Sequence, residues 1–75
     1  MPELAGKSGE QIVRALERLG FERVRQKGSH VTLRKHTQEG VIGCVVPMHR
    51  EVAVGTLRSI LRQAGVTVAE FLANV

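Results

Sequence analysis

The sequence predicts an α+β domain in which two helices cover one face of a three-stranded antiparallel sheet. Apolar residues recur at helical spacing before Gly20 and again after residue 52. Between these stretches the pattern changes to the alternation and the short apolar runs that are typical of strands. The three strand-like segments follow one another closely, which favours an antiparallel meander, and the order αβββα favours a two-layer domain.

The first helix is expected to begin at Ser8, after a short lead-in over residues 1–7. Ser8 and Gln11 fit the S-x-x-Q capping box, in which each side chain accepts a hydrogen bond from the backbone N–H of the other residue. An apolar face follows at helical spacing, formed by Ile12, Val13, Leu16 and Leu19. Gly20 is suited to the left-handed conformation in which many helices end.

A turn at residues 28–29 is expected to join the first two strands. Residues 30–35 alternate, so Val31 and Leu33 should face the helices. In the preceding strand we expect Val24 to face the helices as well. The opposite face of the sheet would then carry Arg23, Arg25, Lys27, His30, Thr32 and Arg34. These cations either form an ordinary solvated face or serve a ligand.

Residues 36–40 are predicted to form a polar loop, followed by a third strand over residues 41–46 that Pro47 ends. Both faces of this strand are apolar, which is compatible with a partner that covers part of the sheet. Cys44 lies in the middle of the strand, where we expect a buried and inert thiol.

The second helix is predicted over residues 53–64 and ends at Gly65. Its apolar positions are Val54, Leu57, Ile60 and Leu61. Thr67 and Glu70 fit a second capping box, which predicts a short C-terminal helix carrying Phe71 and Leu72.

Size and charge limit the function. The chain has 75 residues, which suffices for one domain over residues 1–75 but not for the large clefts of dinucleotide or P-loop enzymes. Eleven Lys and Arg against seven Glu give a net charge of +4, which favours a polyanionic ligand, nucleic acid first. Aromatic residues make up only 3%, which argues against reading single strands by base stacking.

The composition also argues against metal and membrane chemistry. A single Cys excludes an internal disulfide and a Cys-rich zinc site, and the absence of Asp argues against a magnesium nuclease site. We therefore expect neither a metal nor a cofactor. No apolar run approaches the ~20 residues of a membrane span, and no signal peptide is visible, so we expect a cytoplasmic protein.

Three histidines are candidates for proton transfer. His30 follows Gly28, which permits a tight turn and close approach of a ligand, and Ser29, which could bind a phosphate oxygen. His49 lies just before the second helix. For both, the alternative is an ordinary surface or loop histidine, and for His36 in the polar loop a solvated side chain is the expectation.

Three segments together resemble one family, the HicA (YcfA-like) toxins. Residues 21–30 are similar to the end of the G-F-x-x-x-R-Q-K-G-S-H signature of that family. Residues 46–49 resemble its V-P-x-H motif, and residues 55–65 resemble its G-T-L-R-x-I-L-x-Q-A-G helix. The resemblance covers residues 2–73 with the motifs in the same order.

The resemblance implies a fold like that of double-stranded-RNA-binding domains. It further implies an mRNA interferase, the toxin of a type II toxin–antitoxin pair, which a HicB-type antitoxin neutralises. The catalytic histidine of the G-S-H motif corresponds to His30.

Cleavage of RNA without a metal requires a base for the 2′-OH proton, an acid for the leaving oxygen and cations for the phosphate. We expect His30 to transfer a proton and His49 to be a possible second proton carrier. The RNA-binding candidates are Lys27, Gly28, Ser29, Arg34 and Lys35. Two other functions stay open: a non-catalytic RNA-binding module, and a small adaptor whose basic face meets an acidic antitoxin.

Overall fold

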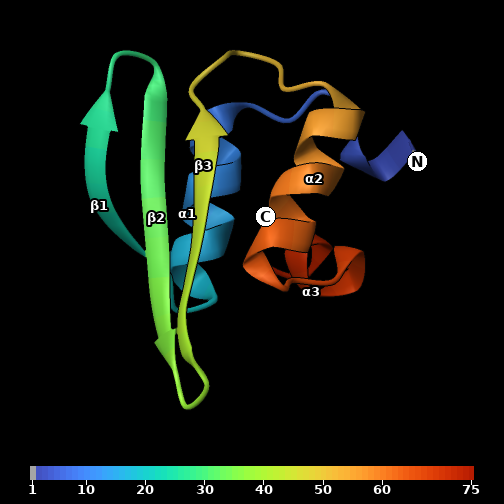
Figure 1. Ribbon diagram of the computed structural model, residues 1–75. Helices are drawn as coiled ribbons and strands as arrows, with labels where there is room; N and C mark the ends of the chain where they lie inside the picture. Colours follow the sequence, from blue (N-terminus) through green and yellow to red (C-terminus); the bar gives the residue numbers. More distant parts are fainter. Residues whose placement is uncertain (1) are drawn as a thin grey trace.

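The computed structural model describes residues 2–75, in which a three-stranded sheet packs against a layer of helices (Figure 1). In chain order the elements are the 3-10 helix η1 (Pro2–Leu4), α1 (Gly9–Arg18), β1 (Glu22–Lys27), β2 (His30–Thr37), β3 (Gly40–Pro47), α2 (Val54–Ala64) and α3 (Val68–Leu72). Both strand pairs are antiparallel and the sheet order is β1-β2-β3. The predicted α+β meander is therefore confirmed, and its order is compatible with a fold like that of double-stranded-RNA-binding domains.

Both predicted capping boxes are present. The Ser8 hydroxyl accepts a hydrogen bond from the Gln11 N–H at 3.1 Å, and the Gln11 side chain accepts one from the Ser8 N–H at 2.8 Å. Thr67 and Glu70 form the same reciprocal pair at the start of α3. Each box satisfies backbone donors that the first helical turn cannot pair internally. The starts of α1 and α3 are thus fixed locally by the sequence.

One face of the sheet forms one side of the core. Val31 and Leu33 of β2 and Cys44 and Val46 of β3 are buried, whereas their neighbours along each strand are not. The helices form the other side, with Ile12, Val13, Ala15, Leu16, Leu57, Ile60, Leu61, Ala64 and Phe71. Burial of each large apolar side chain stabilises the fold by roughly 1.5–3 kcal/mol, so this alternation fixes which face meets the helices.

Leu4 and Val52 are core residues that lie outside the predicted elements. Leu4 of η1 is fully buried and Val52, in the loop before α2, is 2% exposed. The Val52 N–H donates a hydrogen bond to the Lys7 carbonyl at 2.7 Å, so this loop runs beside the lead-in to α1. An isolated apolar residue in a short irregular segment has no periodicity, which is why sequence patterns did not place either residue in the core.

The first strand differs from the prediction because it contains a β-bulge. Arg23 is opposite Leu33 of β2, whereas Arg25 is opposite Thr32, so β1 holds one extra residue between these pairs. Val24 is 43% exposed and does not join the core. The bulge shifts the alternation by one residue, so the prediction that Val24 faces inward and Arg23 outward is wrong.

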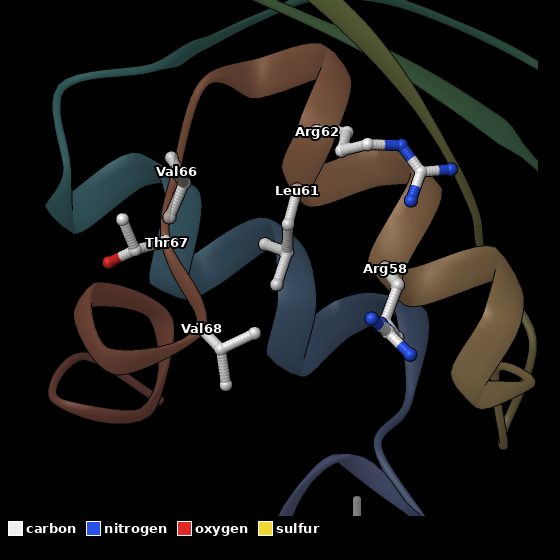
Figure 2. A pocket seen from close by; sticks show the side chains of 6 residues that line it. All are labelled: Arg58, Leu61, Arg62, Val66, Thr67 and Val68. Carbon is white, nitrogen blue, oxygen red and sulfur yellow. The ribbon is translucent and has the colours of Figure 1, made fainter.

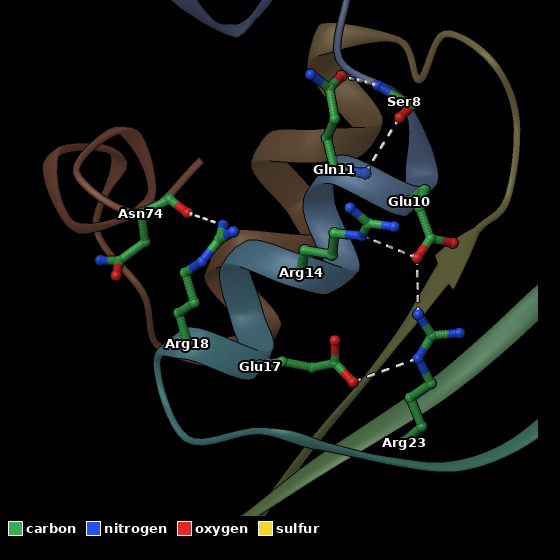
Figure 3. Close-up of polar contacts among 8 residues, drawn as sticks. All are labelled: Ser8, Glu10, Gln11, Arg14, Glu17, Arg18, Arg23 and Asn74. Atoms are coloured by element: carbon green, nitrogen blue, oxygen red, sulfur yellow. Dashed lines mark hydrogen bonds and ion pairs between the residues drawn. The ribbon is translucent and has the colours of Figure 1, made fainter.

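Arg23 instead faces α1 and joins the sheet edge to that helix. Its guanidinium lies 2.8 Å from a Glu10 carboxylate oxygen and 3.3 Å from a Glu17 carboxylate oxygen (Figure 3). The hydrogen bond from Arg23 holds the pKa of Glu10 below its usual value. The three side chains are at least 40% exposed, so water and salt weaken these ion pairs.

The hairpin between β2 and β3 is longer than predicted. Residues 36 and 40 belong to strands, and His36 is paired with Val41. The prediction of a polar loop over residues 36–40 is therefore wrong. Polar residues at the exposed tip of a hairpin can continue the ladder of backbone hydrogen bonds without adding to the apolar pattern. The apolar pattern alone therefore underestimated the length of the two strands.

Cys44 is 3% exposed, which confirms that this side chain is buried. It lies opposite Leu33 of β2. Burial raises the pKa of its thiol to about 11, because an ionised sulfur would lose its hydration there. The thiolate is the reactive form, so the folded protein should protect this side chain from alkylation.

We expect the free energy of unfolding to fall as the pH rises from about 9 towards 11. The thiol of the unfolded chain ionises near pH 8.5, whereas the folded thiol keeps its proton to about pH 11, so alkali favours unfolding. Denaturant unfolding at about pH 8 and about pH 10.5 measures this effect. Between these two pH values, the free energy of unfolding should fall by roughly 2 kcal/mol more in the parent than in Cys44→Ala. Equal losses in both proteins would contradict the burial effect.

Candidate functional site

The face of the sheet opposite the helices carries three of the predicted site residues, Lys27, His30 and Arg34; we call it the open face. Residues that are paired across antiparallel strands lie on the same face of the sheet. The buried Val31 and Leu33 identify the face that packs against the helices. The open face consists of Glu22, Arg25, Lys27, His30, Thr32, Arg34, His36, Val41, Gly43, Val45 and Pro47. It therefore combines cations, two histidines and exposed valines in one surface.

His30 is the first residue of β2 and lies directly opposite Lys27 of β1. The turn between them has Gly28 at φ 59°, in the left-handed region, where a side chain would be strained. The Gln26 side-chain amide donates a hydrogen bond to the Gly28 carbonyl at 3.1 Å, which orders the turn. The structure thus brings Lys27, Gly28, Ser29 and His30 together at one end of the open face.

His49 lies at the same end of the sheet. His30 is opposite Pro47 of β3, and the Met48 N–H donates a hydrogen bond to the Ser29 carbonyl, so the chain leaving β3 stays beside the turn. The His49 carbonyl then accepts a hydrogen bond from the Gly9 N–H at 2.9 Å. These contacts fix the backbone of the exposed His49 near that of His30.

Arg34 and His36 lie on the open face but farther along β2. At about 3.3 Å per residue, the Cα of Arg34 is roughly 13 Å from that of His30, and the Cα of His36 is roughly 20 Å away. Arg34 is opposite Glu22 of β1, yet no ion pair joins these two side chains among residues 2–75. Arg34 could bind a different anion on the same face, whereas His36 is too distant to share one anion with His30.

Lys35 is the one RNA-binding candidate that the structure separates from the others. It is opposite Ile42 of β3, on the helix side of the sheet. Its Nζ lies 5.8 Å from the centre of the Phe21 ring, and its Cε is 3.2 Å from where a Cβ on Gly20 would be. Lys35 therefore covers the end of α1 and does not belong to the open face.

Arg25 belongs to the open face although it was not among the candidate site residues. Its partner Thr32 lies between His30 and Arg34 on β2, so Arg25 adds a cation between the two ends of the site. The alternation of β1 suggested an outward Arg25, but the bulge that removes Arg23 from the same face has no clear signature in the sequence.

A pocket elsewhere in the molecule is unrelated to these residues. It lies in the helical layer and is lined by Arg58, Leu61, Arg62, Val66, Thr67 and Val68 (Figure 2). None of these residues comes from the sheet, so the pocket is not part of the candidate site.

The chemistry available at the open face is proton transfer next to bound anions. An imidazole can exchange a proton near neutral pH, and the adjacent Lys27 can hold negative charge. Within residues 2–75 no three His, Cys or Glu side chains lie close enough together to hold a metal ion, and no helix is long and apolar enough to cross a membrane.

Comparison with known proteins gives one family. The family model described as the HicA toxin of bacterial toxin-antitoxin matches residues 9–66, which includes α1, the whole sheet and α2. No curated protein matches the chain significantly.

We expect Gly9→Ala to destabilise the protein. A Cβ on Gly9 would collide with the Pro47 carbonyl and lie 2.7 Å from the Met48 Cα, so α1 and the segment that carries His49 would have to separate. Such overpacking typically costs about 1–3 kcal/mol, in spite of the higher helix propensity of Ala. Denaturant unfolding measures the change.

Gly55→Ala in the first turn of α2 is the matched control, because a Cβ there would meet nothing within 4 Å. It should leave the stability unchanged or raise it by up to about 1 kcal/mol. Equal stabilities of the two variants would mean that α1 does not approach Pro47 this closely.

Proposed function

Because the chain belongs to the HicA toxin family, we propose that it is a metal-independent endoribonuclease that cleaves mRNA with His30 as its catalytic histidine. The observation that supports this most directly is the position of His30. It is exposed on the open face, opposite Lys27 and next to a turn in which a Cβ on Gly28 would meet nothing within 4 Å.

In the proposed reaction the 2′-oxygen of a ribose attacks the adjacent phosphorus. The 2′-OH proton passes to a base, a bond forms between the 2′-oxygen and phosphorus, and the bond from phosphorus to the 5′-oxygen breaks. An acid then protonates the leaving 5′-oxygen, which gives a cyclic phosphate and a 5′-hydroxyl end. His30 carries out one of the two proton transfers, and His49, fixed at the same end of the sheet, is the candidate for the other.

The charge of the reacting phosphate is held by groups beside His30. Lys27 faces the same side as His30, and the backbone and hydroxyl of Ser29 lie in the turn between them. Arg25 and Arg34 continue the row of cations along the sheet, where the phosphates on either side of the cleaved bond could bind. RNA would therefore lie along the open face, with its cleaved bond near the turn.

The family also implies a protein partner, since its members are toxins of toxin–antitoxin pairs. We propose that a HicB-type antitoxin neutralises this protein. The open face offers exposed valines next to cations, a combination that an apolar and acidic protein surface complements.

We expect His30→Ala to abolish RNA cleavage and growth inhibition without unfolding the protein. Loss of one general acid–base group typically lowers the rate by ~10²–10⁴, and truncation of an exposed side chain typically changes stability by about 0.5 kcal/mol or less. Cleavage of a labelled RNA in excess EDTA, RNA binding and thermal melting measure the three properties. Binding should persist because Lys27 and Arg34 remain.

His36→Ala is the control, because His36 lies on the same face and strand but roughly 20 Å away, and it should cleave RNA as the parent does. His49→Ala tests the second proton transfer. If His30→Ala cleaves RNA at the rate of the parent, His30 is not catalytic. Binding without cleavage by the parent itself would instead favour a non-catalytic RNA-binding module.

RNA binding should weaken as the salt concentration rises. If Arg25, Lys27 and Arg34 each neutralise one phosphate of a single strand, log K should fall against log salt with a slope of about −2. Arg34→Ala should reduce this slope by about 0.7, whereas Lys35→Ala, on the helix side, should leave it unchanged. Equal effects of the two substitutions would place the RNA elsewhere than on the open face.

A further inference from the structure

The two edges of the sheet are built differently. The edge strand β1 carries charged side chains and a bulge, both of which discourage pairing with another strand. The other edge strand, β3, contains no charged residue from Gly40 to Pro47, and its register with β2 is regular over eight pairs. An edge that is long, regular and uncharged is a template for strand addition.

The backbone groups that point away from the sheet can be identified from the register. Antiparallel partners alternate between hydrogen-bonded and non-bonded pairs. The hydrogen bond from Met48 to Ser29 puts Val46, Cys44 and Ile42 in the bonded set, so Val41, Gly43 and Val45 direct their N–H and C=O groups outward.

These outward groups are accessible. Within residues 2–75, no backbone hydrogen bond from outside the sheet reaches Val41, Gly43 or Val45. Gly43 is exposed, and because it has no side chain this exposed surface is backbone. In Figure 1 the hairpin of β2 and β3 extends beyond α1, so its tip stands clear of that helix.

The side chains at this edge indicate what kind of strand fits. Val41 is 58% exposed and Val45 is 44% exposed, and both lie on the open face on either side of Gly43. Gly43 is opposite Arg34, so no side chain of β3 separates Arg34 from the edge. A strand added there would lie roughly 10 Å from β2, a distance that Arg34 and a facing carboxylate can span together.

We propose that the edge of β3 binds an extended segment of a partner protein by strand addition. The segment places apolar side chains beside Val41 and Val45 and an acidic side chain beside Gly43, where it pairs with Arg34. The net charge of +4 favours an acidic partner over a second copy of this chain. The bound strand would also withdraw Arg34 from RNA, a consequence that rests on the proposed function, although strand addition itself does not.

The test uses a capped peptide with the sequence Thr-Val-Thr-Glu-Thr-Val-Thr and the full chain. Amide exchange followed by NMR should show that the peptide protects the N–H groups of Val41, Gly43 and Val45. The N–H groups of Ile42 and Cys44 already bond to β2 and should change little. A peptide with Lys in place of Glu should bind roughly two- to fivefold more weakly, and Arg34→Gln should remove this difference.

The N–H of Val45 points away from β2, so Val45→Pro removes one outward N–H without removing a hydrogen bond to β2. Proline is tolerated at a sheet edge where its nitrogen faces solvent. It should weaken peptide binding by about tenfold or more. Val45→Thr retains the N–H and the branched shape and is the matched control, which should bind nearly as the parent does. Thermal melting of both variants checks that the sheet is intact.

Failure of the Glu peptide to protect the three outward amides would overturn the proposal. The proposal would also be overturned if sedimentation showed that the free protein is a dimer and that Val45→Pro is a monomer. The strand bound at the edge of β3 would then belong to a second copy of this chain. RNA cleavage is measured in parallel on the same samples. Peptide protection in a protein that does not cleave RNA would refute the proposed function and leave strand addition standing.

Discussion

The burial of only one face of the sheet is the constraint on which the rest of the structure depends. Val31 and Leu33 are fully buried in β2, and each contributes roughly 1.5–3 kcal/mol by leaving water. A slip of β2 by one residue would expose both and turn His30 and Arg34 towards the helices, where charges without partners are costly. The hydrophobic core therefore sets the direction of the polar side chains, and through them the place where an RNA could bind.

A second constraint acts at the end of the sheet where His30 lies. The chain leaving β3 is held on one side by the hydrogen bond from Met48 to Ser29 and on the other by the bond from Gly9 to His49. The missing side chain of Gly9 lets α1 approach Pro47 closely enough for the second bond. The start of α1 thus positions the loop at His49 at the end of the sheet where His30 lies.

The bulge in β1 divides the basic residues of that strand between two roles. Arg23 faces α1 and forms ion pairs with Glu10 and Glu17, whereas Arg25 and Lys27 remain on the open face. Lys35 is likewise turned to the helix side, over Phe21. Several cations in the sequence therefore contribute to packing between layers, and the cations left for a ligand are fewer than the net charge suggests. The edge of β3 differs from β1, because its residues from Gly40 to Pro47 are uncharged and, within residues 2–75, no backbone hydrogen bond from outside the sheet reaches its outward groups.

The sequence by itself determined the starts of α1 and α3, the order of the three strands between α1 and α2, the inward side chains of β2 and the exposed position of His30. Each of these follows from a local signal: a capping box, a change of period, or alternation beside a glycine turn. Only the tertiary structure decided the burial of Leu4 and Val52, the reversal of Arg23 and Val24, the strand position of His36 and the separation of Lys35 from the other candidates. These depend on which residues face each other across strands and layers, and a bulge or an isolated apolar contact changes that pairing without leaving a periodic pattern in the chain.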